Sequence, residues 1–221
     1  MSCRIYLVRH GETEWNASMR YQGHADVPLS DNGRRQAQLL GKRLAVEKFG
    51  GFYASDLKRA HETAKIISHF HGLSIETLPE LRELNFGLWE GLRAKEIKAS
   101  YPEVLKQWWE KPLLTRIPNG ETLSEMAQRT VAAVKKIVEC HSGDNIVIVS
   151  HGGVIRSIVG TVLGMDLNKY WRLRQDNACL NIIDFPEWEK GILMLFNDCS
   201  HLEFPPDYMF GATVNRQQLQ P

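Results

Sequence analysis

Two histidines occur in matching contexts far apart in the chain. His10 follows the apolar run at Ile5–Val8, and His151 follows the run at Asn145–Ser150; a glycine comes directly after each histidine. Open α/β sheets bind ligands outside the carboxyl ends of their strands. A glycine at that point allows close backbone approach, and a following helix N-terminus favours an anion. The pattern therefore predicts two imidazoles at one anion-binding edge.

Two arginines can supply the positive charge for such a site. Arg9 directly precedes His10, and Arg59 lies in the first turn of the helix expected after the short run at Phe52–Ser55. Taken alone, a histidine at a strand end is more often structural, and Arg59 is more often a solvent-exposed surface residue. Because a guanidinium group binds phosphate oxygens through parallel N–H bonds, two of them at one sheet edge predict a clamp for a dianion.

Short apolar runs alternate with helical patterns along the chain, which predicts an α/β fold. We expect a three-layer α/β/α sandwich with a mostly parallel central sheet. The expected strands are residues 5–8, 52–55, 75–78 and 145–150, followed by a closing hairpin of 178–185 and 192–196. The expected helices are residues 34–46 with Ser30 as N-cap, 56–67 capped by Ser55 or Asp56, about 124–140, and one opened by 151–153 that runs through 162.

The length of 221 residues fits one large domain. We assign residues 1–202 to it, with an inserted helical lid region at about 84–140, where the sequence is irregular and rich in aromatic residues. Residues 203–221 show no periodicity and are expected to form a C-terminal tail.

Composition argues against several classes of protein. The 27 basic and 26 acidic residues give a net charge of +1, which does not favour binding to nucleic acid. No apolar run approaches the roughly 20 residues of a membrane span, and no signal peptide is recognisable, so a cytoplasmic protein is expected. The four cysteines are scattered and predict no zinc site. A homodimer is left open.

At this point the residues resemble a known family. Leu7–Asn16 (LVRHGETEWN) is similar to the signature of the histidine phosphatase superfamily, the phosphoglycerate mutase-like enzymes. The resemblance runs from residue 4 to about 202. The further matching segments are Gln22-Gly23, Leu29-Ser30 with Gly33 and Gln36-Ala37, Ser55–Ala60 with Thr63-Ala64, Leu81–Glu83, Gly87, Trp89–Gly91, Gly120-Glu121 and Val149–Gly152.

The resemblance implies a metal-independent phosphatase that uses no cofactor. His10 would attack phosphorus and form a phosphohistidine. Glu83 would protonate the leaving oxygen and then activate water, with Glu12, Glu14 and Glu90 as rival carboxylates. The implied catalytic residues are Arg9, His10, Arg59, Glu83 and His151, and the implied substrate contacts are Arg9, Asn16, Gln22, Gly23, Arg59, Glu83, His151 and Gly152.

Alternatives to a phosphatase remain at this stage. A cofactor-dependent phosphoglycerate mutase is disfavoured by the apolar segment Leu84–Trp89 after Glu83 and by the short segment before His151. An inactive binding module is disfavoured because every implied catalytic position is filled. The substrate would be a small phosphorylated metabolite: α-ribazole phosphate, phosphoserine, a sugar phosphate or a broad range. Four aromatic residues would either line the site or belong to the core, namely Phe86, Trp89, Trp108 and Trp109.

Overall fold

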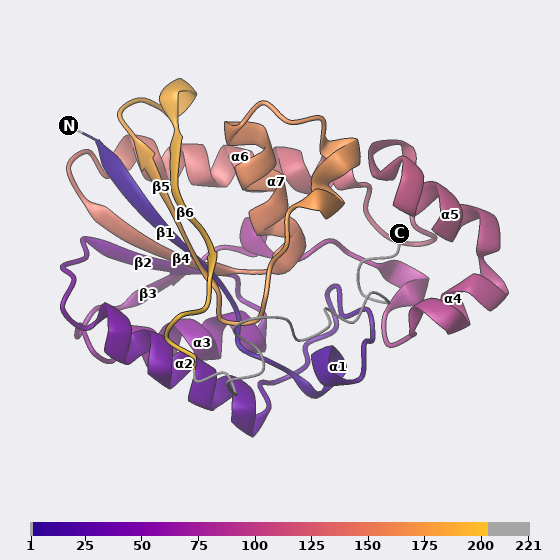
Figure 1. Ribbon diagram of the computed structural model, residues 1–221, viewed down its shortest axis with the longest axis horizontal. Coiled ribbons are helices and arrows are strands. Elements are labelled where there is room, and N and C mark those ends of the chain that lie inside the picture. Colours follow the sequence, from indigo (N-terminus) through magenta and orange to yellow (C-terminus); the bar gives the residue numbers. More distant parts are fainter. Residues whose placement is uncertain (1, 203–221) are drawn as a thin grey trace.

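The computed structural model describes residues 2–202 and places a six-stranded sheet between two layers of helices (Figure 1). The strand order is β3-β2-β4-β1-β5-β6; the first four are parallel, and β5 and β6 add an antiparallel edge. The predicted three-layer fold is confirmed. The strands are β1 (Cys3–Arg9), β2 (Gly51–Ala54), β3 (Ile75–Thr77), β4 (Asn145–Ser150), β5 (Leu180–Phe185) and β6 (Ile192–Asp198).

Each face of the sheet has its own apolar core, because alternate residues of a strand point to opposite sides. Ile5 and Leu7 of β1 join the core under α6 (Leu123–Cys140) and α7 (Gly152–Val162). The intervening side chains of β1, Tyr6 and Val8, join the second core, under α2 (Asp31–Leu44) and α3 (Lys58–Ser68). The two central strands are thus buried on both faces, as their continuous apolar sequences require.

The register of β1 and β4 brings the two histidines together. Arg9 pairs with Ser150 in this parallel ladder, so the residues that follow, His10 and His151, emerge side by side at the carboxyl edge. Gly152 then opens α7, whose N-cap is His151. The sheet edge therefore delivers both imidazoles to the N-terminus of one helix.

The predicted helix starts differ from the observed ones in two places. Ser30 caps α2 as predicted, with its Oγ accepting a bond from Gly33 N at 3.0 Å, but the helix begins at Asp31 rather than at residue 34. The predicted side-chain cap of α3 is wrong: the helix begins at Lys58 without one. Both side chains bind other partners instead: Ser55 Oγ contacts His151, and the Asp56 carboxylate accepts a hydrogen bond from Arg82.

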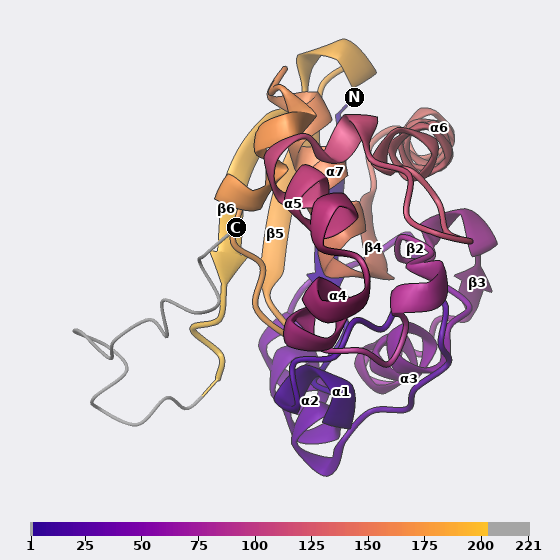
Figure 2. The same ribbon diagram turned by 90° about the vertical axis from the view of Figure 1, so that its right-hand side faces the viewer.

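The segment expected to form an inserted lid divides into two parts. Helix α6 packs on the sheet face, whereas α4 (Ala94–Ser100) and α5 (Pro102–Glu110) lie beyond the carboxyl ends of the strands (Figure 1). Seen from that side, they stand in front of the strands (Figure 2). The remaining short elements are α1 (Glu14–Ala17), η1 (Pro79–Leu81), η2 (Gly87–Trp89), η3 (Pro112–Leu114), η4 (Leu167–Arg172) and η5 (Trp188–Lys190). The predicted tail at 203–221 lies outside the described residues. Among residues 2–202, no helix combines the length and apolarity needed to cross a membrane.

Candidate active site

The two histidine rings lie 5.2 Å apart, centroid to centroid, and both are buried. His10 Nδ1 lies 2.7 Å from the carbonyl oxygen of Gly11. Because a carbonyl oxygen can only accept, Nδ1 carries the proton, and Nε2 keeps its lone pair. His151 Nε2 lies 2.9 Å from Oγ of Ser55, which is also fully buried. Hydrogen bonds thus orient both rings.

Electrostatics keeps both histidines neutral. Burial lowers the pKa of His10 well below 6.5, and the positive charges of Arg59 and Arg9 lower this pKa further. The pKa of His151 is lowered in the same way, first by burial and then by the charge of Arg59. A neutral imidazole whose Nε2 is unprotonated is the form that can act as a nucleophile.

Arg59 is fully buried, and its charge acts on both histidines. Its Nη1 donates to Ala25 O and its Nη2 to Gly23 O, each at 2.7 Å. Burial lowers the pKa of Arg59 to about 10, so the side chain is still a cation at neutral pH. Gly23 has φ +55°, and a Cβ there would lie 2.1 Å from Glu90 Oε1, so this turn requires glycine.

Arg9 is fixed by the last third of the chain, where its Nη1 donates to Gln175 O at 2.6 Å. The neighbouring Ala178 N and Asn177 Nδ2 both donate to the carbonyl oxygen of His10, at 3.1 and 3.2 Å. Residues 175–178 therefore form a support behind the first histidine.

Three buried nitrogen atoms around His10 have no hydrogen-bond partner within the described part of the chain: Arg9 Nε, Arg59 Nε and His151 Nδ1. Buried polar atoms are nearly always hydrogen-bonded. A bound anion with several oxygens, such as a phosphoryl group, has the chemistry to satisfy donors placed in this way.

Asn16 and Gln22 are held by the loop that follows the first histidine. Asn16 Oδ1 accepts from Thr13 N at 3.1 Å and from Asn177 Nδ2 at 3.2 Å. Since a backbone N–H can only donate, this identifies the amide oxygen of Asn16 and leaves its Nδ2 as the group available to a ligand. Thr13 Oγ1 also contacts Gln22 Oε1 at 3.1 Å.

The Glu83 carboxylate lies against the N-terminus of α7. Its Oε2 accepts a bond from Gly153 N at 3.1 Å, and its Oε1 accepts from Leu84 N at 2.9 Å. A Cβ on Gly153 would lie only 2.4 Å from Oε1, so the carboxylate needs a glycine beneath it. Arg129 holds the loop that carries Glu83: it donates to Glu83 O at 2.9 Å and to the carbonyl oxygens of Glu80 and Arg82.

The rival carboxylates have other surroundings. Glu90 Oε1 accepts from the backbone N–H groups of His24 and Phe86, which holds a turn together. Glu12 accepts from Ser30 Oγ, and Glu14 is exposed in the first turn of α1. Glu83 is the only carboxylate among the described residues that line the cavity next to the histidines.

This cavity has a volume of about 230 Å³. The sequence-predicted residues in its wall are Arg9, His10, Asn16, Gln22, Gly23, Arg59, Glu83 and Gly152, and buried His151 lies directly beside His10. Of the four aromatic residues in question, only Phe86 lines the cavity. Trp89 and Trp108 are fully buried in the α6–α7 core, and Trp109 packs against that core.

The sequence interpretation missed part of the wall, including Arg20, Tyr21, Arg156, Tyr170 and Trp171. Arg156 had a usable signal: it lies four residues after Gly152 on α7, and residues four apart share a helix face. Tyr170 and Trp171 come from the short η4 turn, which has no periodicity to indicate which way its side chains point.

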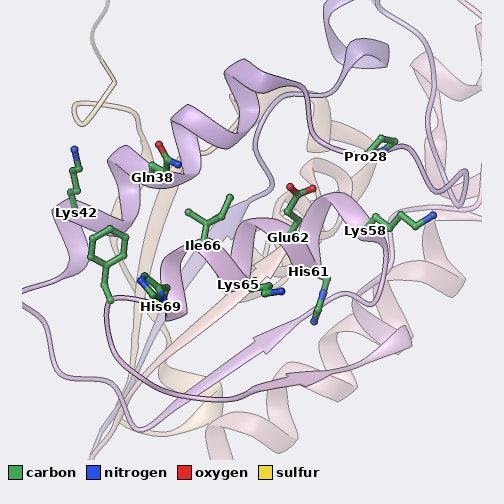
Figure 3. A pocket seen from close by; sticks show the side chains of 10 residues that line it. Pro28, Gln38, Lys42, Lys58, His61, Glu62, Lys65, Ile66 and His69 are labelled. Carbon is green, nitrogen blue, oxygen red and sulfur yellow. The ribbon is translucent and has the colours of Figure 1, made fainter.

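A larger concavity of about 750 Å³ lies elsewhere, along α2 and α3 (Figure 3). It contains none of the predicted site residues. Lys42, Lys58 and Lys65 are spread along its length rather than converging on one point, and Lys58 is paired with Asp26 at 3.2 Å. The smaller cavity is therefore the candidate active site.

The chain is similar to known proteins over most of its length. The profile of the histidine phosphatase superfamily (branch 1) matches residues 5–198. Phosphoserine phosphatase 1 of Hydrogenobacter thermophilus is 34% identical over 201 residues, covering 91% of this chain and 95% of that protein. A Yersinia pestis protein named "Probable phosphoglycerate mutase GpmB" is 37% identical over 211 residues, covering 91% and 96%. The structure of α-ribazole phosphatase from Shigella flexneri superposes with a TM-score of 0.81 at 32% identity, covering 89% and 96%.

Proposed function

The chain belongs to the histidine phosphatase superfamily (branch 1), and on that premise we propose that it hydrolyses small phosphomonoesters of the cytoplasm through a phosphohistidine formed on His10. Membership and the phosphatase-named relatives make it a phosphoric monoester hydrolase. The observation that carries the proposed mechanism is the environment of His10: a buried imidazole whose Nδ1 lies 2.7 Å from Gly11 O and whose pKa is lowered by burial and by the charges of Arg59 and Arg9.

In the first half-reaction, His10 Nε2 forms a bond to phosphorus while the bond to the ester oxygen breaks. The leaving oxygen takes a proton from Glu83. Arg9, Arg59 and His151 stabilise the negative charge on the phosphoryl oxygens, and they are held in place before the substrate arrives. In this proposal the guanidinium groups supply the charge stabilisation, and no step uses a metal.

In the second half-reaction, Glu83 takes a proton from a water molecule, whose oxygen bonds to phosphorus as the bond to His10 breaks. Inorganic phosphate leaves, and His10 returns to its neutral form. Asn16 Nδ2 and the backbone N–H groups at the start of α7 are further proposed contacts for the phosphoryl oxygens.

The test is phosphate release from p-nitrophenyl phosphate in excess EDTA, together with chemical trapping. We expect turnover that is lost in His10→Ala, and an alkali-stable, acid-labile radiolabel on the protein after incubation with a ³²P-labelled ester. Turnover without a labelled protein, or label retained by His10→Ala, would contradict the intermediate.

Phosphoglycerate mutase is the second candidate, supported by the Yersinia pestis relative. The two activities differ in the fate of the phosphohistidine: a mutase returns the phosphoryl group to a glycerate, whereas a phosphatase gives it to water. Incubation with 3-phosphoglycerate and 2,3-bisphosphoglycerate separates them, because a phosphatase releases phosphate and forms no 2-phosphoglycerate.

A further inference from the structure

Arg156 is a fixed cation in the cavity wall that the proposed phosphoryl transfer does not use. Its Nε donates to Leu173 O at 2.7 Å. The guanidinium carbon also lies 5.5 Å from the ring centroid of Trp171 and 5.8 Å from that of Tyr170, close enough for cation–π attraction. The side chain is therefore ordered before any ligand binds.

The terminal nitrogens of Arg156, Nη1 and Nη2, have no hydrogen-bond or ion-pair partner among residues 2–202. Arg20, the other additional cation, differs in this respect: its Nη1 donates to Gly91 O at 2.5 Å and lies 3.7 Å from the Glu96 carboxylate. Arg156 thus lines the cavity and has an unpartnered planar pair of donors. Such a pair can bind a carboxylate through two parallel bonds.

The charges of the wall are unequal. Among residues 2–202, the lining contains the four arginines Arg9, Arg20, Arg59 and Arg156 and one carboxylate, Glu83. Arg9 and Arg59 match the two charges of a phosphomonoester dianion, and Arg20 lies 3.7 Å from the Glu96 carboxylate. With Glu83 protonated, as the proposed general acid must be, the charge of Arg156 is matched neither by the phosphoryl group nor by a neighbouring carboxylate. A ligand with one more negative charge would complement the wall better.

The position of Arg156 fits a group a few bonds away from phosphorus. Gly152, at the proposed phosphoryl contact, lies one helical turn earlier on α7, and four residues span roughly 6 Å along a helix. The cavity of about 230 Å³ is also smaller than the roughly 300–1,000 Å³ typical of sites for drug-sized ligands. Both features favour a compact ester over a nucleoside phosphate.

We propose that Arg156 binds a carboxylate of the substrate, so that the preferred substrates are phosphate esters of small hydroxy acids or hydroxy amino acids, with the carboxylate two or three bonds from the ester oxygen. This inference rests on the proposed function and deepens it. Arg156 would set specificity, while His10 and Glu83 carry the chemistry.

The test compares O-phosphoserine with its carboxamide, which has the same shape but lacks the carboxylate charge. The measured quantity is the ratio of kcat/KM for the two esters, since a general loss of activity cancels in it. We expect the wild-type ratio to exceed about 10, the value of one charge-assisted hydrogen-bond pair. In Arg156→Gln the ratio should fall close to 1, and in Arg156→Lys it should be intermediate, because the charge remains but the fork is lost.

The matched control is Arg172→Gln. Arg172 is exposed and does not line the cavity, although it belongs to η4, the turn that contributes Tyr170 and Trp171 to the cavity wall. Its ratio should equal that of the wild type. A wild-type ratio near 1, or a high ratio that survives Arg156→Gln, would overturn the proposal. A ratio that falls equally in Arg172→Gln would also overturn it, because long-range charge alone would then explain the preference.

Binding measurements keep the inference separate from the proposed function. In a His10→Ala background, calorimetry should show tighter binding of O-phosphoserine than of the carboxamide, and Arg156→Gln should remove the difference. If the wild-type protein hydrolyses neither p-nitrophenyl phosphate nor any other ester, the proposed function fails. The binding data would still decide whether Arg156 recognises a carboxylate. Equal binding of both ligands in the His10→Ala protein would refute the inference alone.

Discussion

Gly153→Ala tests the placement of Glu83 with one methyl group. The added Cβ would lie 2.4 Å from Glu83 Oε1, whereas carbon and oxygen atoms in close contact stay roughly 3.3–3.6 Å apart. The carboxylate must therefore retreat by about 1 Å, which breaks its bond from Gly153 N. A displacement of that size at a catalytic group can cost about 100-fold in rate.

The expected loss depends on the leaving group. An alkyl phosphate needs a proton on its departing oxygen, so kcat for such an ester should fall about 100-fold in Gly153→Ala. The p-nitrophenolate anion leaves with little protonation, and we expect its release to fall by less than about 10-fold. The free energy of unfolding should change little, because alanine stabilises a helix by roughly 0.5–1 kcal/mol relative to glycine and offsets part of the strain.

A double-mutant cycle with Glu83→Gln shows whether the methyl group acts through the carboxylate. If it does, the double variant should be no slower than Glu83→Gln by more than about 2-fold on the alkyl ester, since the group to be displaced is already gone. Additive losses, or equal losses on both esters in Gly153→Ala alone, would refute the placement of the general acid.

Three further predictions concern the groups that support the site. Ser55→Ala removes the 2.9 Å bond to His151 and should lower kcat about 10-fold with KM nearly unchanged, in steady-state kinetics; an unchanged kcat would contradict the orienting role. Folding lowers the pKa of His10 and His151, so below a pH of about 6.5, the usual histidine pKa, the unfolded chain binds more protons than the folded one. The free energy of unfolding should therefore be greatest above about pH 6.5 and fall below it by up to about 2.7 kcal/mol per pH unit for the pair. Denaturant titrations at several pH values measure this slope, which should be smaller in His10→Asn. Arg129→Met removes the hydrogen bonds that hold the loop carrying Glu83 and should lower Tm by about 5–10 °C, since charged hydrogen bonds worth roughly 2–3 kcal/mol are lost. A Tm that falls by less than about 2 °C would show that other contacts hold the loop.

The parts of the site that were predictable from sequence are those attached to strand ends. His10 and His151 follow buried strands, and the parallel pairing of such strands fixes where the next residues emerge. The contacts made by Ser55 were not predictable in this way. A serine before a helix normally caps it, and only the tertiary structure shows that its Oγ meets the second histidine.

The hydrogen bonds to main-chain carbonyl groups were also not predictable from the sequence. The carbonyl oxygens of Gly23, Gln175 and Leu173 fix three of the arginines, and every residue type offers the same carbonyl group. The identities of these residues therefore give no signal from which the hydrogen bonds could be predicted. Trp89 illustrates the opposite difficulty: an indole ring suits a ligand site and a core equally well, and only the packing decides that it belongs to the core.

The support behind the first histidine has a consequence for synthesis on the ribosome. β1 emerges among the first residues of a nascent chain, yet the carbonyl of Gln175 and the N–H groups of Asn177 and Ala178, which hold Arg9 and His10, emerge more than 160 residues later. A polypeptide interrupted after α7 would already contain both imidazoles but would leave the first of them unanchored. Enzymatic competence should therefore arrive late and abruptly in translation, when the antiparallel edge closes.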